Sequence, residues 1–534
     1  MRSLFFKSFI IISIGLLIAA CASRGRPTGG EKDTEPPVIV RSDPENYSTN
    51  FEGDEIRIYF DEYIKLKNIQ KQLIVSPPMD NAPIITPLSA SRYISIKILD
   101  TLKENTTYAF NFGQSIVDNN EENPFSYYRY VFSTGPEIDS LSVQGVVMDA
   151  QNRQPDAFIS VMLYEADSTY TDSIVYKEKP KYITNTLDSL TTFSIDNIKE
   201  GRYKLVALKD ENGNYTYEPK TDKIGFVEGF IDVPKDTTYL IKLFKQTPDF
   251  KAGRTYQAGE TRIGFPFEGN SEGTTIDILD GAPEGFESII TKDTKTDTLY
   301  YWHKPKLELD STFFKIKNSV YQDTLKHMFR AADKDSLVVT SLTTGTISYN
   351  EDFTLEGSVP FKSLSKEKIK IINKDSLDVP FEVVYDSVFN RYKFPIALEE
   401  DQRYNATFLP GALTDFYDTE NDTLSYNFRT RLKSEYGNIR VNLRNASFPL
   451  IVQLVDEQDK VQYEKYTESS PVIDFNNLTP KSYYIRVIYD TNSNKKFDSG
   501  NFLKGTFPER VSYYPKVIEV RANFDYVEEF TLLD

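Results

Sequence analysis

The chain has 534 residues, and at one domain for about 100 to 200 residues it should contain three to five domains. Its 62 basic and 79 acidic residues give a net charge of −17, which disfavours general electrostatic binding to nucleic acid or anionic lipid. Two histidines, His303 and His327, and one cysteine, Cys21, are too few for multi-histidine zinc sites, cysteine clusters or intramolecular disulfides. Aromatic residues make up 13% of the chain, and together with abundant Ile, Val and Thr they predict an all-β fold.

Residues 1–20 have the pattern of an export signal. Arg2 and Lys7 precede an apolar run over residues 9–18. This run is shorter than the ~20 residues that a helix needs to cross ~30 Å of hydrocarbon. We therefore expect a signal peptide rather than a permanent membrane span.

Cys21 follows Ile18-Ala19-Ala20, and these four residues resemble the bacterial lipobox. In that family the thiol is alkylated by diacylglycerol, the signal is cut before the cysteine and the new amino terminus is usually acylated. The resemblance implies permanent anchoring, because each buried CH₂ of the acyl chains contributes ~0.8 kcal/mol. Ala22 stands where Asp is associated with inner-membrane retention, so the implied destination is the outer membrane. The alternative is a chance cysteine in a plain signal peptide.

Residues 21–34 hold no large apolar side chain and are predicted to be a lipidated, flexible tether. Surface-exported lipoproteins of Bacteroidota resemble one another in having acidic residues directly after the cysteine. Here residues 22–26 are basic, and Glu31 and Asp33 come only later. We expect the cell surface, and the periplasmic face of the membrane stays open as the alternative.

Short strands with alternating apolar and polar residues recur after Pro36, for example over residues 56–60, 94–98 and 128–132. Period-two alternation with polar turns every 8 to 12 residues is typical of β-sandwiches. The best candidate for an amphipathic helix of more than three turns is a weak one over residues 318–334.

Two internal repeats organise the chain. Residues 193–210 align without gaps with residues 473–490, and residues 102–112 align with residues 398–408 at an offset of 296. Repeats of this size indicate tandem small domains in an extended array. We predict module A over residues 35–135, module B over 136–248, module X over 249–344, module A′ over 345–432 and module B′ over 433–534.

Module A resembles the bacterial Ig-like domain of the SbsA type. The resemblance is carried by Pro36-Pro37, Ser42-x-Pro44-x-Asn46, Ile58-x-Phe60-x-Glu62 and Tyr130-x-Phe132-Ser133-Thr134. Residues 21–37 are similar to the start of Ig-like-domain lipoproteins of Bacteroidota, and module B, through residues 145–149 and 193–210, resembles carboxypeptidase-regulatory or Cna-B sandwiches. Module X matches no family that we can name. These resemblances imply an extracytoplasmic setting and scaffolding or binding, with no catalytic residues.

Asp490, Asn492, Asn494 and Asp498 place oxygen ligands at positions 1, 3, 5 and 9 of one loop, a pattern that suits Ca²⁺. The loop departs from an EF-hand, since Lys495 stands where glycine makes the sharp turn and Asn501 stands where the bidentate glutamate belongs. The alternative is a connecting loop whose Asx side chains cap their own backbone. The repeat has a weaker copy of the loop, formed by Asp210, Asn212, Asn214 and Glu218.

Other candidate residues have plain structural interpretations. Asp61 and Glu62 are neighbours in a strand and point to opposite faces, so they do not suit glycoside hydrolysis. Trp302 follows Leu299-Tyr300-Tyr301 and is a candidate ligand-binding residue, with a core position as the alternative. We expect the acidic residues of the loops in A and A′ to be solvated; they are Asp118, Glu121, Glu122, Asp415, Asp418 and Asp422.

These observations predict a non-enzymatic, lipid-anchored outer-membrane protein that docks other outer-membrane or surface proteins. One concrete version is an accessory subunit of the β-barrel assembly or secretion machinery. The alternative is a surface lipoprotein that binds or processes glycans, with module X as the site. The expected partners are membrane lipid, through acylated Cys21, and proteins, but not nucleic acid.

Overall fold

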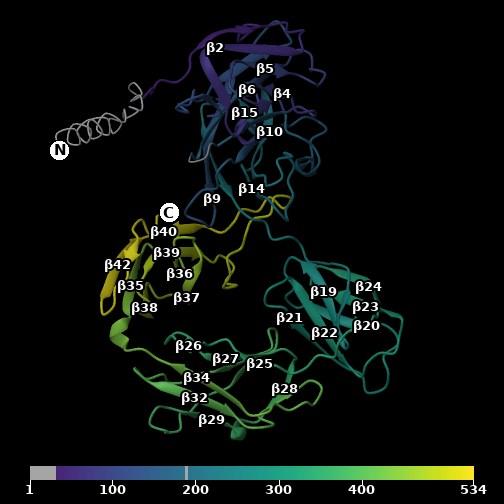
Figure 1. Ribbon diagram of the computed structural model, residues 1–534, viewed down its shortest axis with the longest axis vertical. Coiled ribbons are helices and arrows are strands. Elements are labelled where there is room, and N and C mark those ends of the chain that lie inside the picture. The colour runs from purple at the N-terminus through teal and green to yellow at the C-terminus, as the bar shows by residue number, and fades with distance from the viewer. Residues whose placement is uncertain (1–31, 187–189, 534) are drawn as a thin grey trace, which may run out of the picture. The chain divides into compact units, whose positions relative to one another are not determined.

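The computed structural model describes residues 32–186 and 190–533, and Figure 1 shows that their regular secondary structure is almost entirely β-strand. The all-β sandwich prediction is confirmed. The chain divides into two compact units, one made of the described parts of 1–142, 181–187 and 195–199, the other of those of 143–180, 188–194 and 200–534. Helical segments among the described residues are α2 (Ile69–Gln72), η1 (Asp172–Tyr176), η2 (Lys366–Lys368) and η3 (Lys433–Glu435).

Module A consists of two sheets around one apolar core. One sheet has the order β1-β2-β5-β4, with β7 also paired to β2, and the other has the order β3-β6-β8. The strands are β1 (Ile39–Asp43), β2 (Glu55–Leu66), β3 (Ile74–Ser76), β4 (Ile84–Thr86), β5 (Ser91–Lys97), β6 (Thr107–Asn111), β7 (Ile116–Asp118) and β8 (Arg129–Ser133).

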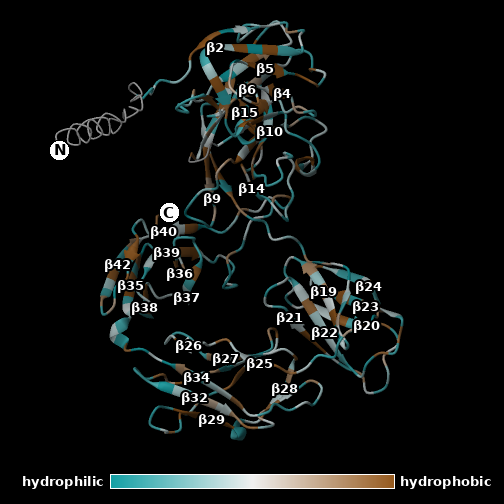
Figure 2. Ribbon diagram, viewed as in Figure 1, coloured by the Kyte–Doolittle hydropathy of each residue, from teal (hydrophilic) through white to brown (hydrophobic). Residues whose placement is uncertain are grey.

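The alternation of β2 explains how this sheet closes its core. Ile56, Ile58 and Phe60 are buried, and the residues between them face outward, because successive side chains of a strand point to opposite faces. Figure 2 shows the resulting hydrophobic and hydrophilic bands along β2. Ile58 lies opposite Ile94 of β5, and each such buried side chain contributes roughly 1.5–3 kcal/mol to folding.

Module B repeats the two-sheet plan. In the second unit β10, β13 and β14 are neighbours in one sheet, β15 also pairs with β13, and β16 runs parallel to β9. β11 belongs to the first unit, and β12 spans the division between the units. The strands are β9 (Leu141–Asp149), β10 (Ser160–Glu165), β11 (Tyr182–Asn185), β12 (Thr192–Ile198), β13 (Gly201–Lys209), β14 (Lys223–Phe226), β15 (Ile231–Val233) and β16 (Thr238–Leu243).

Module X has a sheet of order β17-β19-β22-β21, with β18 also on β19, and a sheet of order β20-β23-β24. The weak helix candidate over residues 318–334 is not a helix, because Gln322–Met328 pairs with β23 along its whole length. Within it Leu325 and His327 are the more buried residues, which is the period of a strand. The strands are β17 (Lys251–Ala252), β18 (Tyr256–Gly259), β19 (Arg262–Glu268), β20 (Thr275–Ile278), β21 (Glu287–Lys292), β22 (Thr298–Lys304), β23 (Ser311–Lys317) and β24 (Gln322–Met328).

Module A′ shares the main strand order of A. The order β25-β27-β31-β30 corresponds to β1-β2-β5-β4, and β29-β32-β34 corresponds to β3-β6-β8. The strands β27 and β28 together take the place of β2, since β28 pairs with β33 as β2 pairs with β7, and β26 is an additional strand beside β34. Since β25 pairs with β27, the module begins before the predicted residue 345. The strands are β25 (Val339–Ser341), β26 (Gly345–Thr346), β27 (Phe353–Gly357), β28 (Phe361–Leu364), β29 (Ile369–Ile372), β30 (Val384–Asp386), β31 (Arg391–Phe394), β32 (Arg403–Phe408), β33 (Leu413–Asp415) and β34 (Leu424–Arg429).

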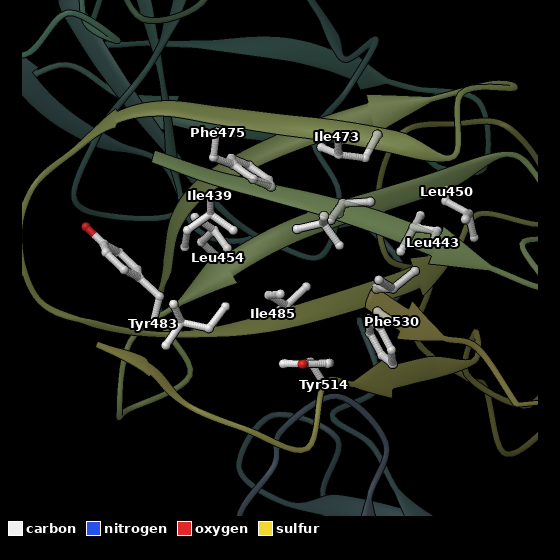
Figure 3. Close-up of a cluster of buried hydrophobic side chains, with 14 of the residues drawn as sticks. Ile439, Leu443, Leu450, Leu454, Ile473, Phe475, Tyr483, Ile485, Tyr514 and Phe530 are labelled. Carbon is white, nitrogen blue, oxygen red and sulfur yellow. The ribbon is translucent and has the colours of Figure 1, made fainter. Parts of the chain in front are cut away.

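Module B′ has sheets of order β37-β36-β39-β40, with β41 on β39, and β38-β35-β42. β35 and β42 run parallel, as β9 and β16 do in B. Figure 3 shows its core, where Ile439 and Phe475 of one sheet face Leu454 and Ile485 of the other. The strands are β35 (Gly437–Arg444), β36 (Leu450–Val455), β37 (Val461–Thr467), β38 (Val472–Leu478), β39 (Ser482–Tyr489), β40 (Val511–Tyr513), β41 (Ile518–Glu519) and β42 (Asp525–Thr531).

Within the second unit, modules B and B′ pack directly on each other. The ring of Phe226 lies 5.3 Å from that of Phe502 and 4.7 Å from that of Phe507. The buried guanidinium of Arg486 donates to the carbonyl oxygen of Gln151 at 3.3 Å. A buried cation needs such acceptors, so this contact fixes the pairing of the two modules.

Candidate functional site

An exposed row of arginine and tyrosine crosses three strands of module A. The register of the sheet places Arg41 of β1 opposite Tyr59 of β2, and Tyr59 opposite Tyr93 of β5. The Arg41 guanidinium lies 3.8 Å from the centre of the Tyr59 ring, and the Tyr59 and Tyr93 rings are 5.7 Å apart. Tyr93 remains 44% exposed. The row is therefore preorganised by its own contacts and open to solvent.

A second exposed pair lies on the same two strands. Tyr63 of β2 is 54% exposed, and the Arg92 guanidinium lies 5.1 Å from the centre of its ring. We call Arg41, Tyr59 and Tyr93 the Tyr/Arg face. Arg and Tyr are enriched in protein interfaces, where Tyr gives a large contact area at a low entropy cost. The many tyrosines are evident in the sequence, but these were not selected from it, since only the strand register brings them together.

The adjacent carboxylates of β2 have separate structural roles. Asp61 accepts a hydrogen bond from the Val38 backbone N–H at 2.8 Å. Burial raises the pKa of Glu62, and the nearby charge of Asp118 raises it further. Neither environment brings the two carboxylates together as a facing pair for acid–base chemistry.

The acidic loops of A and A′ are only partly solvated, which corrects the sequence-based expectation. Asp118 and Asp415 are buried, and each accepts hydrogen bonds from the backbone N–H groups of its own loop. Glu122 is exposed, and its hydrogen bonds with Lys65 and Lys67 lower its pKa to about 2. The two buried aspartates shape the loops because unpaired N–H groups would otherwise be left inside.

Asp418 also departs from the solvated-turn expectation, because it is exposed but paired. It forms ion pairs with Lys362 and with Lys304, the latter at 3.1 Å, and these contacts lower its pKa. Lys304 belongs to X and Asp418 to A′, so the ion pair joins consecutive modules of the second unit.

The predicted calcium loop of B′ is closed by its own side chains. Asp490 is buried, and its two oxygens accept from the backbone N–H groups of Asn494 and Lys495 at 3.1 and 2.9 Å. The amide groups of Asn492 and Asn494 donate to Asp498. These are the contacts of an Asx-capped loop.

A buried acid outside the sequence pattern completes this loop and its copy in B. Glu509 accepts from the N–H groups of Thr491 and Asp498 at 2.7 and 3.1 Å. In B, the buried Asp222 accepts in the same way from the N–H groups of Glu211 and Glu218. Sequence reasoning missed Glu509 because it lies well beyond the nine-residue pattern, so spacing alone carried no signal for it.

The weaker copy of the loop, in B, is closed in the same manner. Asp210 accepts from the N–H groups of Asn212, Gly213 and Tyr215, and the amides of Asn212 and Asn214 donate to Glu218. Within residues 32–186 and 190–533, no group of three or more His, Cys, Asp or Glu side chains is arranged to hold a metal ion. Calcium binding at Asp490, Asn492, Asn494 and Asp498 stays a prediction.

Trp302 is buried rather than exposed as a stacking platform, which agrees with the core position given as the alternative. It is 2% exposed and clusters with Val359 and Phe416 of module A′. Its indole N–H donates to the Thr291 hydroxyl at 2.8 Å, and the Arg262 guanidinium lies 4.8 Å from its ring centre. With its ring covered and its donor satisfied, Trp302 holds X against A′.

The two histidines are buried in the core of module X. Burial lowers the pKa of His303, and it lowers that of His327 to about 4. His303 Nδ1 lies 3.1 Å from the carbonyl oxygen of Pro305, and its ring stacks on Phe286. Because their pKa values lie below the ordinary value, both are neutral core residues at pH 7.

The predicted signal peptide, the lipidation site Cys21 and all but the end of the tether lie outside the described residues. Among the residues that are described, none belongs to a helix with the length and apolar character needed to cross a bilayer.

The fold and its exposed faces define a protein of tandem β-sandwich modules. Residues 33–134 match the family model of the bacterial Ig-like domain, as the resemblance of module A implied. No curated protein matches the chain.

The solved structures that are similar to the chain include the following three. The surface layer protein SbsC, domains 1–6, has 9% identity over 91% of this chain and 67% of that chain, with a TM-score of 0.16. The BSP domain of a biofilm associated protein has 8% identity over 88% and 97%, with a TM-score of 0.16. The Bacillus anthracis TIE protein has 10% identity over 95% and 76%, with a TM-score of 0.14.

Proposed function

We propose that this protein is a non-enzymatic, lipid-anchored docking component of the bacterial outer membrane, and that module A binds another protein through its Tyr/Arg face. The observation that carries the proposal is the row of Arg41, Tyr59 and Tyr93, which is ordered across three strands and exposed. A rigid aromatic surface loses little side-chain entropy when it is covered, so it suits a binding site.

The bacterial Ig-like domain at residues 33–134 supports an extracytoplasmic setting for the proposal. The lipobox-like residues that end at Cys21 support anchoring beside the bilayer, and Ala22 supports the outer membrane. Module A directly follows the tether, so its face would operate close to the membrane. A barrel protein of the outer membrane, or an assembly or secretion complex, is the partner that this position favours.

The glycan alternative depended on Trp302 as an exposed ring. Because Trp302 is covered in the second unit, its ring offers no stacking surface for a sugar. We therefore retain protein docking as the single proposed function.

The docking proposal is tested by extraction of membranes in mild detergent, affinity purification and mass spectrometry of the proteins that copurify. We expect Tyr59→Ser combined with Tyr93→Ser to remove the partner and to leave the protein folded. Tyr47→Ser is the matched control, because Tyr47 is an exposed tyrosine of the same module outside the face. A partner that is retained by the double variant would contradict the role of this face.

The anchoring proposal is tested separately with Cys21→Ser. We expect this variant to leave the membrane fraction and to show a changed mass at its amino terminus. Unchanged membrane fractionation and mass would contradict the lipid anchor. Protease added to intact and to lysed cells then distinguishes the cell surface from the periplasmic face.

A further inference from the structure

A groove of about 640 Å³ lies between the two sheets of module X. It is bounded by β18, which pairs only with β19, and by β24, which is the last strand of its sheet. The residues that line it are Arg254, Thr255, Tyr256, Gln257, Lys326, Met328, Arg330 and Ala331. The proposed docking through module A does not use this groove.

The floor of the groove is held by a polar network around His327. Its Nδ1 lies 3.1 Å from the Thr255 hydroxyl oxygen, and its Nε2 lies 2.8 Å from the Gln257 side-chain oxygen. The Thr255 hydroxyl is also 3.3 Å from the carbonyl oxygen of Lys326. These contacts join β24 to the start of β18, so the two walls keep a fixed separation.

The walls carry side chains of alternating direction. Lys326, Met328 and Arg330 occupy every second position and are exposed, whereas His327 and Phe329 between them pack inward. On the other wall, Arg254 and Tyr256 are exposed in the same alternation. The groove therefore combines cations with two accessible apolar surfaces, since Tyr256 is 42% and Met328 is 50% exposed.

The charge of the groove is opposite to that of the chain as a whole. Its lining contains three cationic side chains and no carboxylate, in a protein of net charge −17. Across the described parts of the chain, the ion pairs engage other lysines and arginines and leave Arg254, Lys326 and Arg330 out. An anionic ligand would supply counter-charges to these three exposed cations.

We infer that this groove binds an extended acidic segment of a partner protein. The inference rests on the proposed docking function and adds the chemistry of a second contact. Arg, Tyr and Met are the residue types enriched in protein interfaces, and Met adapts its shape to different apolar side chains. Arginine pairs with carboxylates in a planar, bidentate manner, which gives the contact its direction.

The spacing of the cations specifies the segment. Lys326 and Arg330 are four residues apart, which is about 13 Å in an extended chain at ~3.3 Å per residue. A partner segment that is also extended matches this spacing with acidic side chains at positions i and i+4. The apolar side chain at position i+2 lies on the same face as the two acids and would meet Met328 and Tyr256.

The test measures binding of a fluorescent peptide to the purified full-length protein in detergent. The peptide carries Asp at positions i and i+4 with apolar residues between them, and its control carries Asn at both positions. We expect the acidic peptide to bind, the control to bind about tenfold more weakly, and affinity to fall as salt is raised.

Matched variants locate the binding. Lys326→Gln combined with Arg330→Gln should weaken the acidic peptide about tenfold, because two exposed charge pairs are lost. Lys315→Gln combined with Lys317→Gln removes similar charge from β23 of the same sheet and should change binding by less than about twofold. Equal binding of the Asp and Asn peptides, or equal loss in both double variants, would overturn the inference.

One further outcome distinguishes an acidic peptide from an anionic glycan. Binding of a sulfated oligosaccharide at the groove without binding of the acidic peptide would overturn the inference in favour of an anionic glycan.

The groove and the Tyr/Arg face can fail separately. Loss of the copurified partner in the variant with Tyr59→Ser and Tyr93→Ser, together with an acidic peptide that does not bind, would contradict the groove proposal alone. Peptide binding at Lys326 and Arg330 with no copurified protein would defeat the proposed function of module A alone.

Discussion

Modules A and A′ have the same interior and different exteriors. In A the Tyr108 hydroxyl accepts from the Lys103 backbone N–H at 2.9 Å, and in A′ the Tyr404 hydroxyl accepts from the Glu399 N–H at 2.8 Å. Each tyrosine ring stacks on a core phenylalanine, with ring centres 5.4 Å apart in A and 5.3 Å apart in A′. The sequence repeat at offset 296 is therefore a repeat of core contacts.

The outward rows at the equivalent strand positions have different chemistry. In A the row is Arg41, Tyr59 and Tyr93, whereas in A′ the register places Thr340 opposite Glu356 and Glu356 opposite Arg391. Arg391 and Glu356 form an ion pair of 2.6 Å, which satisfies the surface internally. The two modules thus share the core contacts that stabilise the fold. Of the two, only A carries the exposed Tyr/Arg face.

The largest expected effect comes from removing the shared aromatic core. Phe132→Ala in A and Phe428→Ala in A′ each delete a buried ring that packs on the corresponding tyrosine of its own module. We expect each to lower the unfolding free energy of its module by about 3–5 kcal/mol. Limited proteolysis in increasing urea, with mass spectrometry to assign the cut module, measures this loss. A small loss in either module would show that the two cores are not equivalent.

The tyrosine hydroxyls should have smaller and equal effects. Tyr108→Phe and Tyr404→Phe each remove the acceptor of one backbone N–H and leave that donor unpaired. We expect a loss of about 1–3 kcal/mol in each module, measured by the same assay. Markedly unequal losses would mean that the hydroxyl supports only one of the two folds.

Acid should distinguish module X from modules A and A′, because the two histidines of the chain lie in X. Burial lowers the pKa of His303, and it lowers that of His327 to about 4, from an unfolded value of about 6.5. Between these pH values the unfolded state binds more protons than the folded state, so the stabilisation is complete above about pH 6.5 and is lost as pH falls toward 4. For His327 the unfolding free energy should change by at most about 1.4 kcal/mol per pH unit in this range.

This pH dependence is measured by urea unfolding of the full chain at several pH values, with peptides of X followed separately from those of A and A′. His327→Gln should make the unfolding free energy of module X depend less steeply on pH. If X kept its stability from pH 7 to pH 4 while A and A′ lost theirs, the neutral-histidine interpretation would be wrong.

The smallest effect on stability should accompany the largest change in binding. Tyr59→Glu combined with Tyr93→Arg gives A the outward pair of A′, and we expect the unfolding free energy of A to change by no more than about 0.5 kcal/mol. The same variant should lose the copurified partner. If module A still bound its partner with these two residues of A′ in place, the row would not distinguish the functions of the two copies.

Sequence alone was sufficient for the class of fold and for much of its organisation. Alternation at Ile56, Ile58 and Phe60 predicted a half-buried strand because period-two patterns depend only on local geometry. The repeat over residues 193–210 and 473–490 recovered β12–β13 and β38–β39, since side chains that fill equivalent cores are constrained in the same way. The proposed export and lipid anchoring also rest on sequence, because their evidence is the lipobox-like motif that ends at Cys21.

Long-range pairing decided the features that sequence did not show. Strand register places Tyr59 between Arg41 and Tyr93, residues far apart in the chain, and the packing of X on A′ buries Trp302. Glu509 contacts the loop of Asp490 because the chain folds back onto that loop after leaving it. Local spacing fixes which face of a strand a side chain takes, but exposure and neighbours depend on which other strand lies beside it, and only the tertiary structure determines that.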